Sequence, residues 1–448
     1  MTHAEITRLL QKEMVPALGC TGPTAYALAT ACCKPHLTAT PEAVKIFVSP
    51  AFLKIGFGVA TPGTSQPGIE IAAAIGLVGG DYTLGLQVLQ PATDTDMEQA
   101  TALVERGLIQ VLCAEEKTGV YVRAEVTTAN ETVVAVVEHT HDGISLIQVN
   151  DEVKLKAAPE TEEAQADAPA QLTLEDIFSY IQTAELSELR FLWDGYLMNL
   201  ALAEDGLKGG FGLASGRAYL TGWWQAQGGI PADLPQRPMD YLPTTIADRS
   251  KVLVAAASDA RMGGSRLPAL AAMGDGNQGL TATLPVGAAA ELMNVSREKA
   301  CRALALSCLM LFYVKLQIGR AAAFCLCAIA AAAGVAAGIG YLRDFSEEQI
   351  RGAVKNVISP LAGMLCDGAK NGCALKMAIA ASSALTAVDL AAAGIQMGYF
   401  DGVCDDSLED TVACITGIAT RSMELLDGCM VDEIVKKAAR KRLESSKF

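Results

Sequence analysis

The chain has 448 residues, and its 35 basic and 50 acidic side chains give a formal net charge of −15. This charge repels phosphate backbones and anionic lipid headgroups, so we expect no nucleic-acid or membrane partner. Hydrophobic residues make up 51% of the chain but aromatic residues only 5%. Small Ala side chains therefore dominate the apolar content and favour closely packed helices, and the length predicts two or three domains.

The N-terminal segment has a helical pattern, with Ile6, Leu9, Leu10 and Met14 mostly spaced by three or four residues. A second helix is predicted to open after Gly22-Pro23, and residues 1–40 are assigned as helices that join the catalytic domain. The segment lacks the uninterrupted apolar stretch of a signal peptide. Together with 13 cysteines, an odd number, this indicates reduced thiols and a cytoplasmic location.

Residues 41–155 are predicted to form an α/β domain, because short β-rich runs alternate there with helical patterns such as residues 96–107. The runs are VKIFVSP, YTLGLQVL, IQVLCA, VYVRAEVTT, TVVAVVEHT and ISLIQVN. Residues 156–172 combine Pro, Ala and acidic residues without apolar periodicity, which predicts an acidic linker. Residues 173–448 are predicted to be a helical catalytic domain, so the fold class is α+β and predominantly helical.

Residues 321–341 form an uncharged run of membrane-spanning length between Arg320 and Arg343. Ala and Gly dominate this run, and such small side chains suit a buried central helix of a soluble bundle as well as a membrane span. We favour the soluble interpretation. A membrane protein is the alternative.

Two cysteine motifs stand out by their surroundings. Cys366 and Cys373 lie in MLCDGAKNGCALK, where glycines and Asn371 predict a loop that can turn both thiols toward one point. Cys325 and Cys327 are two residues apart, so on a helix they would project about 200° apart and only one could face the same centre. Three thiolates at a metal would leave one coordination position open for substrate.

Most of the other cysteines are interpreted as core or surface filler, because Cys packs as a small hydrophobe in Ala-rich helices. This group comprises Cys32, Cys33, Cys113, Cys301, Cys308, Cys404, Cys414 and Cys429.

At the cysteine motifs the sequence resembles the L-cysteine desulfidase family, which is related to the α chain of iron-sulfur L-serine dehydratases. The resemblance covers nearly the whole chain. It is carried, in order, by VPALGCTGPTAYALA, LKIGFGVATPGT, EHTHDGI, ASDARMGG, GDGNQGLTATLPV, FCLCAIAAAAG and GMLCDGAKNGCALK.

The resemblance implies a [4Fe-4S] cluster held by Cys327, Cys366 and Cys373, with the fourth iron open to substrate. It also implies that Cys20 acts as a base or sulfur acceptor, with a ligand role as the alternative; a helix start would favour its thiolate. The implied reaction is a β-elimination from a small amino acid, which would convert L-cysteine to pyruvate, ammonia and sulfide without pyridoxal phosphate.

Several polar residues are candidates for binding the substrate. Asn277 and Gln278 offer amide donors for a carboxylate, and Lys54 offers a positive charge. His139 is favoured over His141, with which it would share a face in a continued strand. For a further set we predict a structural role, as an ion-paired turn: Ser258, Asp259 and Arg261.

The sequence departs from the family pattern beside these residues. Gly22 stands where Glu is usual, Ile55 where Lys-Asn is usual, Asp275 where Ser is usual and Leu326 where Gly is usual. The substrate is therefore open between L-cysteine and L-serine or a related hydroxy amino acid. A non-catalytic homologue that binds a cluster or zinc is a further alternative, and a homodimer is expected.

Overall fold

The structure is a computed structural model that describes residues 1–157, 172–319 and 322–445. Helices make up 58% of the chain and accompany a mixed sheet, which confirms the α+β, predominantly helical class. The chain forms two compact units. A helical unit comprises Met1–Gly19, Glu160–Leu365 and Asn371–Ile418, and a sheet unit comprises Cys20–Pro159, Cys366–Lys370 and Ala419–Phe448.

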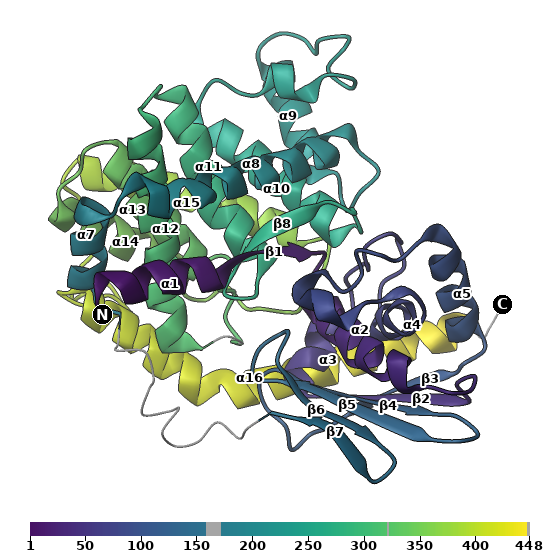
Figure 1. Ribbon diagram of the computed structural model, residues 1–448. Coiled ribbons are helices and arrows are strands. Elements are labelled where there is room, and N and C mark those ends of the chain that lie inside the picture. Colours follow the sequence, from purple (N-terminus) through teal and green to yellow (C-terminus); the bar gives the residue numbers. More distant parts are fainter. Residues whose placement is uncertain (158–171, 320–321, 446–448) are drawn as a thin grey trace. The chain divides into compact units, whose positions relative to one another are not determined.

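In the helical unit, an N-terminal helix leads into a two-stranded sheet (Figure 1). α1 (His3–Glu13) begins with a capping box formed by Thr2 and Glu5. The strand β1 (Met14–Leu18) then pairs antiparallel with β8 (Pro268–Ala272). The sequence predicted only helices over residues 1–40 and so missed this strand, because Met14–Leu18 pair with β8 instead of continuing the helix.

The core of the helical unit is built from helices in which nearly every residue is buried, as the Ala content predicted. α11 (Gly276–Leu292) contacts α10 (Ile246–Met262), α12 (Arg297–Ile318) and α13 (Ala330–Leu342). Small residues bring these helices together: a Cβ on Gly334 would lie 2.3 Å from the carbonyl oxygen of Ser307. Around them lie α7 (Leu174–Thr183), α8 (Leu186–Lys208), α9 (Ser215–Ala226), η3 (Pro238–Tyr241), α14 (Glu347–Leu361) and α15 (Cys373–Ala392).

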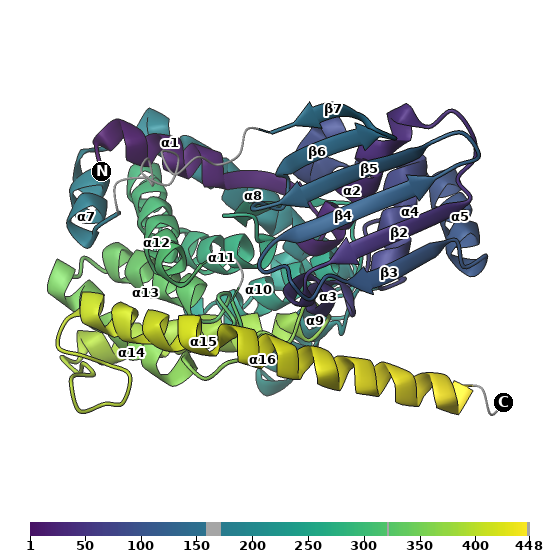
Figure 2. The ribbon, with the colours of Figure 1, turned by 90° about the horizontal axis from the view of Figure 1, so that it is seen from below.

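The described part of the sheet unit contains six strands in the order β3-β2-β4-β5-β6-β7, seen side by side in Figure 2. β2 is parallel to β3, and all the other pairs are antiparallel. α2 (Thr21–Cys33) packs on β4 and β5 and against α4 (Ile69–Gly79). The strands are β2 (Ala43–Val48), β3 (Ile109–Cys113), β4 (Tyr121–Thr127), β5 (Thr132–Glu138), β6 (Ile144–Val149) and β7 (Glu152–Lys156).

The remaining helices of this unit are α3 (Pro50–Gly56), η1 (Lys34–His36), η2 (Tyr82–Gln87), α5 (Asp94–Glu105) and the later part of α16 (Leu408–Ser445). Five of the six predicted strand runs are strands. YTLGLQVL is not, because Gly85 adopts φ 52° and the carboxylate of Asp81 accepts a hydrogen bond from the N–H of Thr83, which together form the turn η2.

The unit boundaries differ from the predicted domains in that α2 lies with the sheet rather than with the catalytic helices. Its small residues allow this packing, since a Cβ on Gly76 of α4 would lie 2.3 Å from the carbonyl oxygen of Ala27. The predicted acidic linker at residues 156–172 falls almost wholly outside the described residues.

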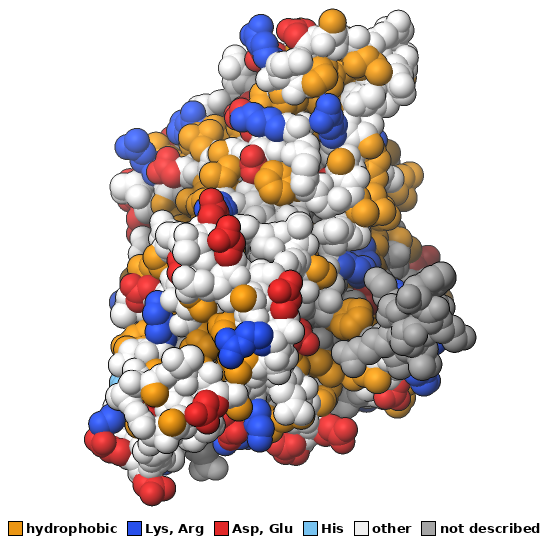
Figure 3. Space-filling model, turned by 90° about the vertical axis from the view of Figure 1, so that its right-hand side faces the viewer, with side chains coloured by type: hydrophobic (Ala, Val, Ile, Leu, Met, Phe, Trp, Pro, Cys, Tyr) orange, Lys and Arg blue, Asp and Glu red, His pale blue; other side chains and the backbone are white. Residues whose placement is uncertain are grey.

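The predicted membrane-length run is not one helix. Residues 322–329 are irregular and α13 has 13 residues, which is too short to span a bilayer. By length and composition alone, α12 and α15 could cross a membrane, with 83% and 50% of their apolar windows buried. Burial of this kind is typical of core helices in soluble proteins. On the face drawn in Figure 3, basic side chains lie among acidic and apolar ones.

Candidate functional site

The start of α11 is the most polar buried place in the helical unit. Met273 and Gly274 turn the chain with positive φ after β8, and Asp275 then caps the helix. One carboxylate oxygen of Asp275 accepts hydrogen bonds from the backbone N–H of Asn277 at 2.8 Å and of Gln278 at 3.3 Å. The other oxygen accepts one from Nε2 of Gln278 at 3.0 Å.

The guanidinium of Arg261 lies directly over this helix start. Arg261 comes from the last turn of α10 and is only 2% exposed. A Cβ on Gly276 would lie 2.3 Å from its Nε and 2.5 Å from its Cζ, so only glycine leaves room for the guanidinium. Among the described residues, Nε and Nη2 of Arg261 have no hydrogen-bond acceptor, and Oδ1 of Asn277 and Oε1 of Gln278 have no donor.

Two cysteines adjoin the same helix start. Cys327 donates its thiol to the carboxylate of Asp275 at 3.7 Å. A hydrogen bond with Cys327 lowers the pKa of Cys325 to about 7. The same bond, burial and the nearby Asp275 and Cys373 raise the pKa of Cys327. Cys325, Cys327 and Cys373 therefore interact within one unit.

The FCLC motif does not lie on a helix, so the helical separation of about 200° does not apply to its two thiols. Residues 326–329 form a turn, and α13 begins at Ala330. The backbone N–H of Cys325 bonds instead to the carbonyl of Met364. Both Cys325 and Cys327 are consequently available to the same region.

Cys373 and Cys366 belong to different units. Cys373 is the first residue of α15 in the helical unit, whereas Cys366 lies in the sheet unit, directly after Leu365, whose backbone pairs with that of Phe324. The loop after Cys366 includes Gly368, at φ 93°, where a Cβ would lie 2.3 Å from the carbonyl oxygen of Lys54. Within the described residues, no three His, Cys, Asp or Glu side chains are grouped so as to hold a metal ion.

Cys20 is the N-cap of α2 and only 5% exposed, as its predicted place at a helix start requires. Its carbonyl accepts hydrogen bonds from the N–H and the hydroxyl of Thr24, at 3.1 and 3.0 Å. The two unusual residues nearby pack against each other, since a Cβ on Gly22 would lie 2.4 Å from Cγ2 of Ile55. The start of α2 therefore carries no charged side chain, and its polar groups are the thiol and the hydroxyls of Thr21 and Thr24.

Lys54 is buried and forms an ion pair with Asp427 at 2.6 Å inside the sheet unit. Its positive charge thus already has a partner. β5 ends at Glu138, so the two histidines that follow do not continue a strand: His139 is exposed with φ 67°, and His141 is buried, with its ring 5.6 Å from that of Phe52.

Asp259 does not form the predicted ion-paired turn. Its carboxylate instead accepts hydrogen bonds from the hydroxyl of Ser215 at 2.8 Å and the N–H of Gly216 at 2.9 Å, at the start of α9. Burial raises the pKa of this carboxyl. Sequence reasoning took Arg261 as structural and so missed the unsatisfied guanidinium. The only available signal was the small residue Gly276 following Asp275 in the GDGNQG motif.

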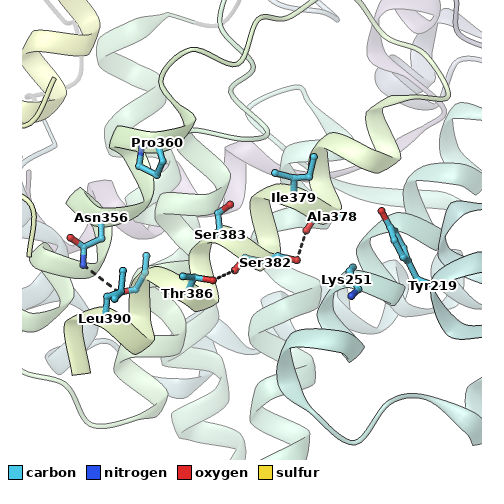
Figure 4. A pocket seen from close by; sticks show the side chains of 11 residues that line it. Tyr219, Lys251, Asn356, Pro360, Ala378, Ile379, Ser382, Ser383, Thr386 and Leu390 are labelled. Carbon is cyan, nitrogen blue, oxygen red and sulfur yellow. Dashed lines mark hydrogen bonds between the residues drawn. The ribbon is translucent and has the colours of Figure 1, made fainter. Parts of the chain in front are cut away.

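A separate groove of about 410 Å³ lies on the helical unit between α9, α10, α14 and α15 (Figure 4). None of the predicted site residues lines it. The hydroxyls of Ser382 and Thr386 are hydrogen-bonded to carbonyls of their own helix. Lys251 is paired with Asp248, so the groove offers little polar chemistry.

Comparison with known proteins identifies the family. The family model described as "Serine dehydratase alpha chain" matches residues 83–432. A UPF0597 protein of Desulforapulum autotrophicum is 36% identical over 98% of this chain and 99% of its own length. The UPF0597 protein YhaM of Salmonella enteritidis is 35% identical over 96% of both chains. The resemblance seen in the sequence is confirmed at this level, and the chain belongs to the serine dehydratase alpha chain family.

Proposed function

We propose that the protein is an iron-sulfur-dependent lyase that eliminates the β substituent of a small amino acid, with L-cysteine as substrate and pyruvate, ammonia and sulfide as products. Membership of a serine dehydratase family supports a lyase. The observation that carries the proposal is the meeting of Cys327 and Cys373 beside Asp275 in the helical unit. Thiolates are the usual ligands of iron-sulfur clusters.

The cluster would be held by Cys327, Cys366 and Cys373. The donor chemistry suits such a cluster, because the partly buried thiols of Cys327 and Cys373 interact in the helical unit and thiolates are the usual cluster ligands. When bound, the cluster supplies a Lewis acid that polarises the substrate. Cys325 remains an alternative ligand to Cys327.

The protein's own residues would move the proton. We propose that Sγ of Cys20 removes the proton from Cα, because Cys20 is the N-cap of α2 and helix N-termini favour thiolates. As the Cα–H electrons form the Cα=Cβ bond, the β substituent leaves with its bonding pair. The aminoacrylate then hydrolyses to pyruvate and ammonia. We propose Asn277, Gln278, Lys54 and His139 as groups that bind the substrate.

The second candidate is a dehydratase of L-serine or a related hydroxy amino acid, which the name of the family model favours. The mechanism is the same with hydroxide as the leaving group. Release of sulfide and pyruvate from L-cysteine, compared with pyruvate from L-serine, distinguishes the two when measured on anaerobically prepared protein. Turnover of neither substrate would refute both candidates.

A test of the cluster needs no turnover. Anaerobically purified protein should be brown, with a visible band that dithionite bleaches and with roughly equal iron and acid-labile sulfide. Cys366→Ala should lose both elements, whereas Cys429→Ala, a change at an exposed thiol, should keep them. A colourless protein containing zinc or no metal would support the non-catalytic homologue instead, and full retention of iron in Cys366→Ala would refute the ligand assignment.

The reduced thiols also favour a cytoplasmic enzyme, and we propose a homodimer as its assembly. Cell fractionation and analytical ultracentrifugation of the full chain test these two points separately. Recovery in the membrane fraction would contradict the first, and a monomer at micromolar concentration would contradict the second.

A further inference from the structure

The α10–α11 junction presents unsatisfied groups of both kinds. Arg261 offers two donors, Nε and Nη2, while Asn277 and Gln278 each offer an amide oxygen as acceptor, and all four atoms are buried without partners among the described residues. These residues are 2–4% exposed. Buried polar atoms in native proteins are nearly always hydrogen-bonded, so a cluster of exceptions at one place indicates a ligand.

The donors have the geometry of a carboxylate receptor. Nε and one terminal nitrogen of a guanidinium form an edge of two parallel N–H groups, which matches the two oxygens of a carboxylate. Gly276 makes this edge possible, because any Cβ there would collide with Nε and Cζ of Arg261. The positive end of the α11 dipole adds to the preference for an anion.

The acceptors have the chemistry of an ammonium receptor. Gln278 donates its amide nitrogen to Asp275, so its Oε1 must face elsewhere. Nδ2 of Asn277 lies 3.6 Å from Sδ of Met262, which likewise leaves Oδ1 to accept. An ammonium group carries three donors and no acceptor, and the carboxylate of Asp275 contributes a negative charge to the same place.

We propose that the α10–α11 junction binds the zwitterionic head group of the α-amino-acid substrate, with the guanidinium of Arg261 on its carboxylate and the amide oxygens of Asn277 and Gln278 on its ammonium. This inference deepens the proposed function and rests on it for the identity of the substrate. It reverses the sequence expectation, in which the two amides donate to the carboxylate and Arg261 is structural. Arg261 becomes the residue that selects amino acids over amines.

A structural role for Arg261 makes the opposite prediction about stability. A buried charge with unsatisfied hydrogen-bonding atoms destabilises the folded chain, so its removal should leave the thermal midpoint unchanged or higher. If Arg261 instead braced the fold, Arg261→Met would lower the midpoint. The thermal midpoint and the ligand binding of Arg261→Met together therefore distinguish a structural role of Arg261 from a ligand-binding role.

The test is calorimetric binding of L-alanine to the full chain, purified anaerobically with its cofactor. L-Alanine has the head group but no β leaving group, and L-alaninamide lacks the carboxylate. Arg261→Met should weaken L-alanine binding on the order of 100-fold and leave the weak binding of L-alaninamide unchanged. Gly276→Ala should also weaken the binding of L-alanine, although the charge of Arg261 is retained. Arg217→Met, at a half-buried arginine that donates to the carbonyl of Lys208, is the control and should bind as the unaltered chain does.

The outcomes separate this inference from the proposed reaction. Binding that depends on Arg261, without turnover of cysteine or serine, would keep the head-group site and refute the reaction. Turnover by the unaltered chain with equal L-alanine binding in Arg261→Met and Gly276→Ala would overturn the head-group site alone. If Arg261→Met does not fold, the prediction that the thermal midpoint stays unchanged or rises is wrong. Unchanged L-alanine binding in Arg261→Lys and Gly276→Ala would then refute the head-group site as well.

Discussion

The two units each bury a cation that the sequence places beside a glycine-rich motif, and they treat it differently. Lys54 in the sheet unit and Arg261 in the helical unit are both only 2% exposed. Lys54 is paired with Asp427 at 2.6 Å, whereas Nε and Nη2 of Arg261 have no acceptor among the described residues. Equal burial thus accompanies unequal pairing. Lys54 thus already has a counter-ion, whereas two nitrogens of Arg261 remain available to a ligand.

The largest expected effect comes from removing the partner of Lys54. Asp427→Ala leaves the ammonium buried without its ion pair, so we expect the free energy of unfolding to fall by about 3–5 kcal/mol. Replacing both residues, as in Lys54→Met with Asp427→Leu, should recover most of this loss because no charge remains. Denaturant unfolding of the full chain measures both. A double variant no more stable than Asp427→Ala would show that the pair does not act as a unit, and would weaken the contrast with Arg261.

The next effect concerns the apolar helix start beside Cys20. Gly22→Glu forces a Cβ to within 2.4 Å of Cγ2 of Ile55 and buries a carboxylate, so we expect a loss of about 3 kcal/mol. Adding Ile55→Asn makes room and supplies an amide donor, and should recover about 1–2 kcal/mol. Calorimetric midpoints of the single and double variants measure the coupling. Additive effects would show that these two departures from the family pattern are independent.

The sequence predicts a structural feature well when residues close together in the chain determine it, and poorly when the determining residues are far apart in the chain. Local signals were sufficient for α1, for α2 and for five strand runs, since capping residues and period-two alternation act within a few residues. They failed at Tyr82–Gln87, where one glycine conformation ends the strand pattern. They also failed at FCLC, because the N–H of Cys325 bonds to Met364, which lies far along the chain.

The candidate site was predictable in its residue types but not in its pairing. The family resemblance selected Cys327 and Cys373 as ligands, and the two thiols interact electrostatically in the structure. Lys54 and its partner Asp427 are 373 residues apart in the chain. No sequence pattern in α16 predicts that Asp427 pairs with Lys54. Arg261 is buried, and its Nε and Nη2 have no acceptor in the part of the chain that the structure describes, and neither property is local. The long-range part of the site therefore required coordinates.

A smaller effect is expected for a buried anion that has its full set of donors. Glu131 accepts hydrogen bonds from the hydroxyl and N–H of Thr38, at 2.6 and 2.9 Å, and from the hydroxyl of Thr128. The Thr38 hydrogen bonds lower the pKa of this carboxyl below its ordinary value of 4.5. Because the folded pKa is the lower one, the stabilisation is complete above pH 4.5 and is lost as the pH falls through the folded pKa.

Glu131→Gln removes this dependence. The unaltered chain should be the more stable of the two at pH 7, and the difference should shrink as the pH falls below 4.5. Unfolding midpoints measured at several pH values compare the pair. If the two midpoints differ by the same amount at pH 7 and at pH 3, Glu131 is not ionised in the folded chain. Glu131 would then be a buried group without a charge, unlike Lys54.

The smallest expected effect concerns only the reactivity of cysteine thiols. It tests whether the cores of the two units differ in packing. Burial raises the pKa of Cys32 in α2 and of Cys308 in α12 to about 12, so neither should form a thiolate at pH 8. Iodoacetamide at that pH should label the exposed Cys414 and Cys429 first, with denatured protein as the control for complete labelling. Equal protection of Cys32 and Cys308 would mean that both cores exclude the reagent equally. Looser packing would then not explain why Nε and Nη2 of Arg261 find no acceptor among the described residues. Rapid labelling of Cys308 alone would show that the helical core admits the reagent and the sheet core does not. Looser packing would then explain why the two nitrogens of Arg261 are unsatisfied while Lys54 is paired.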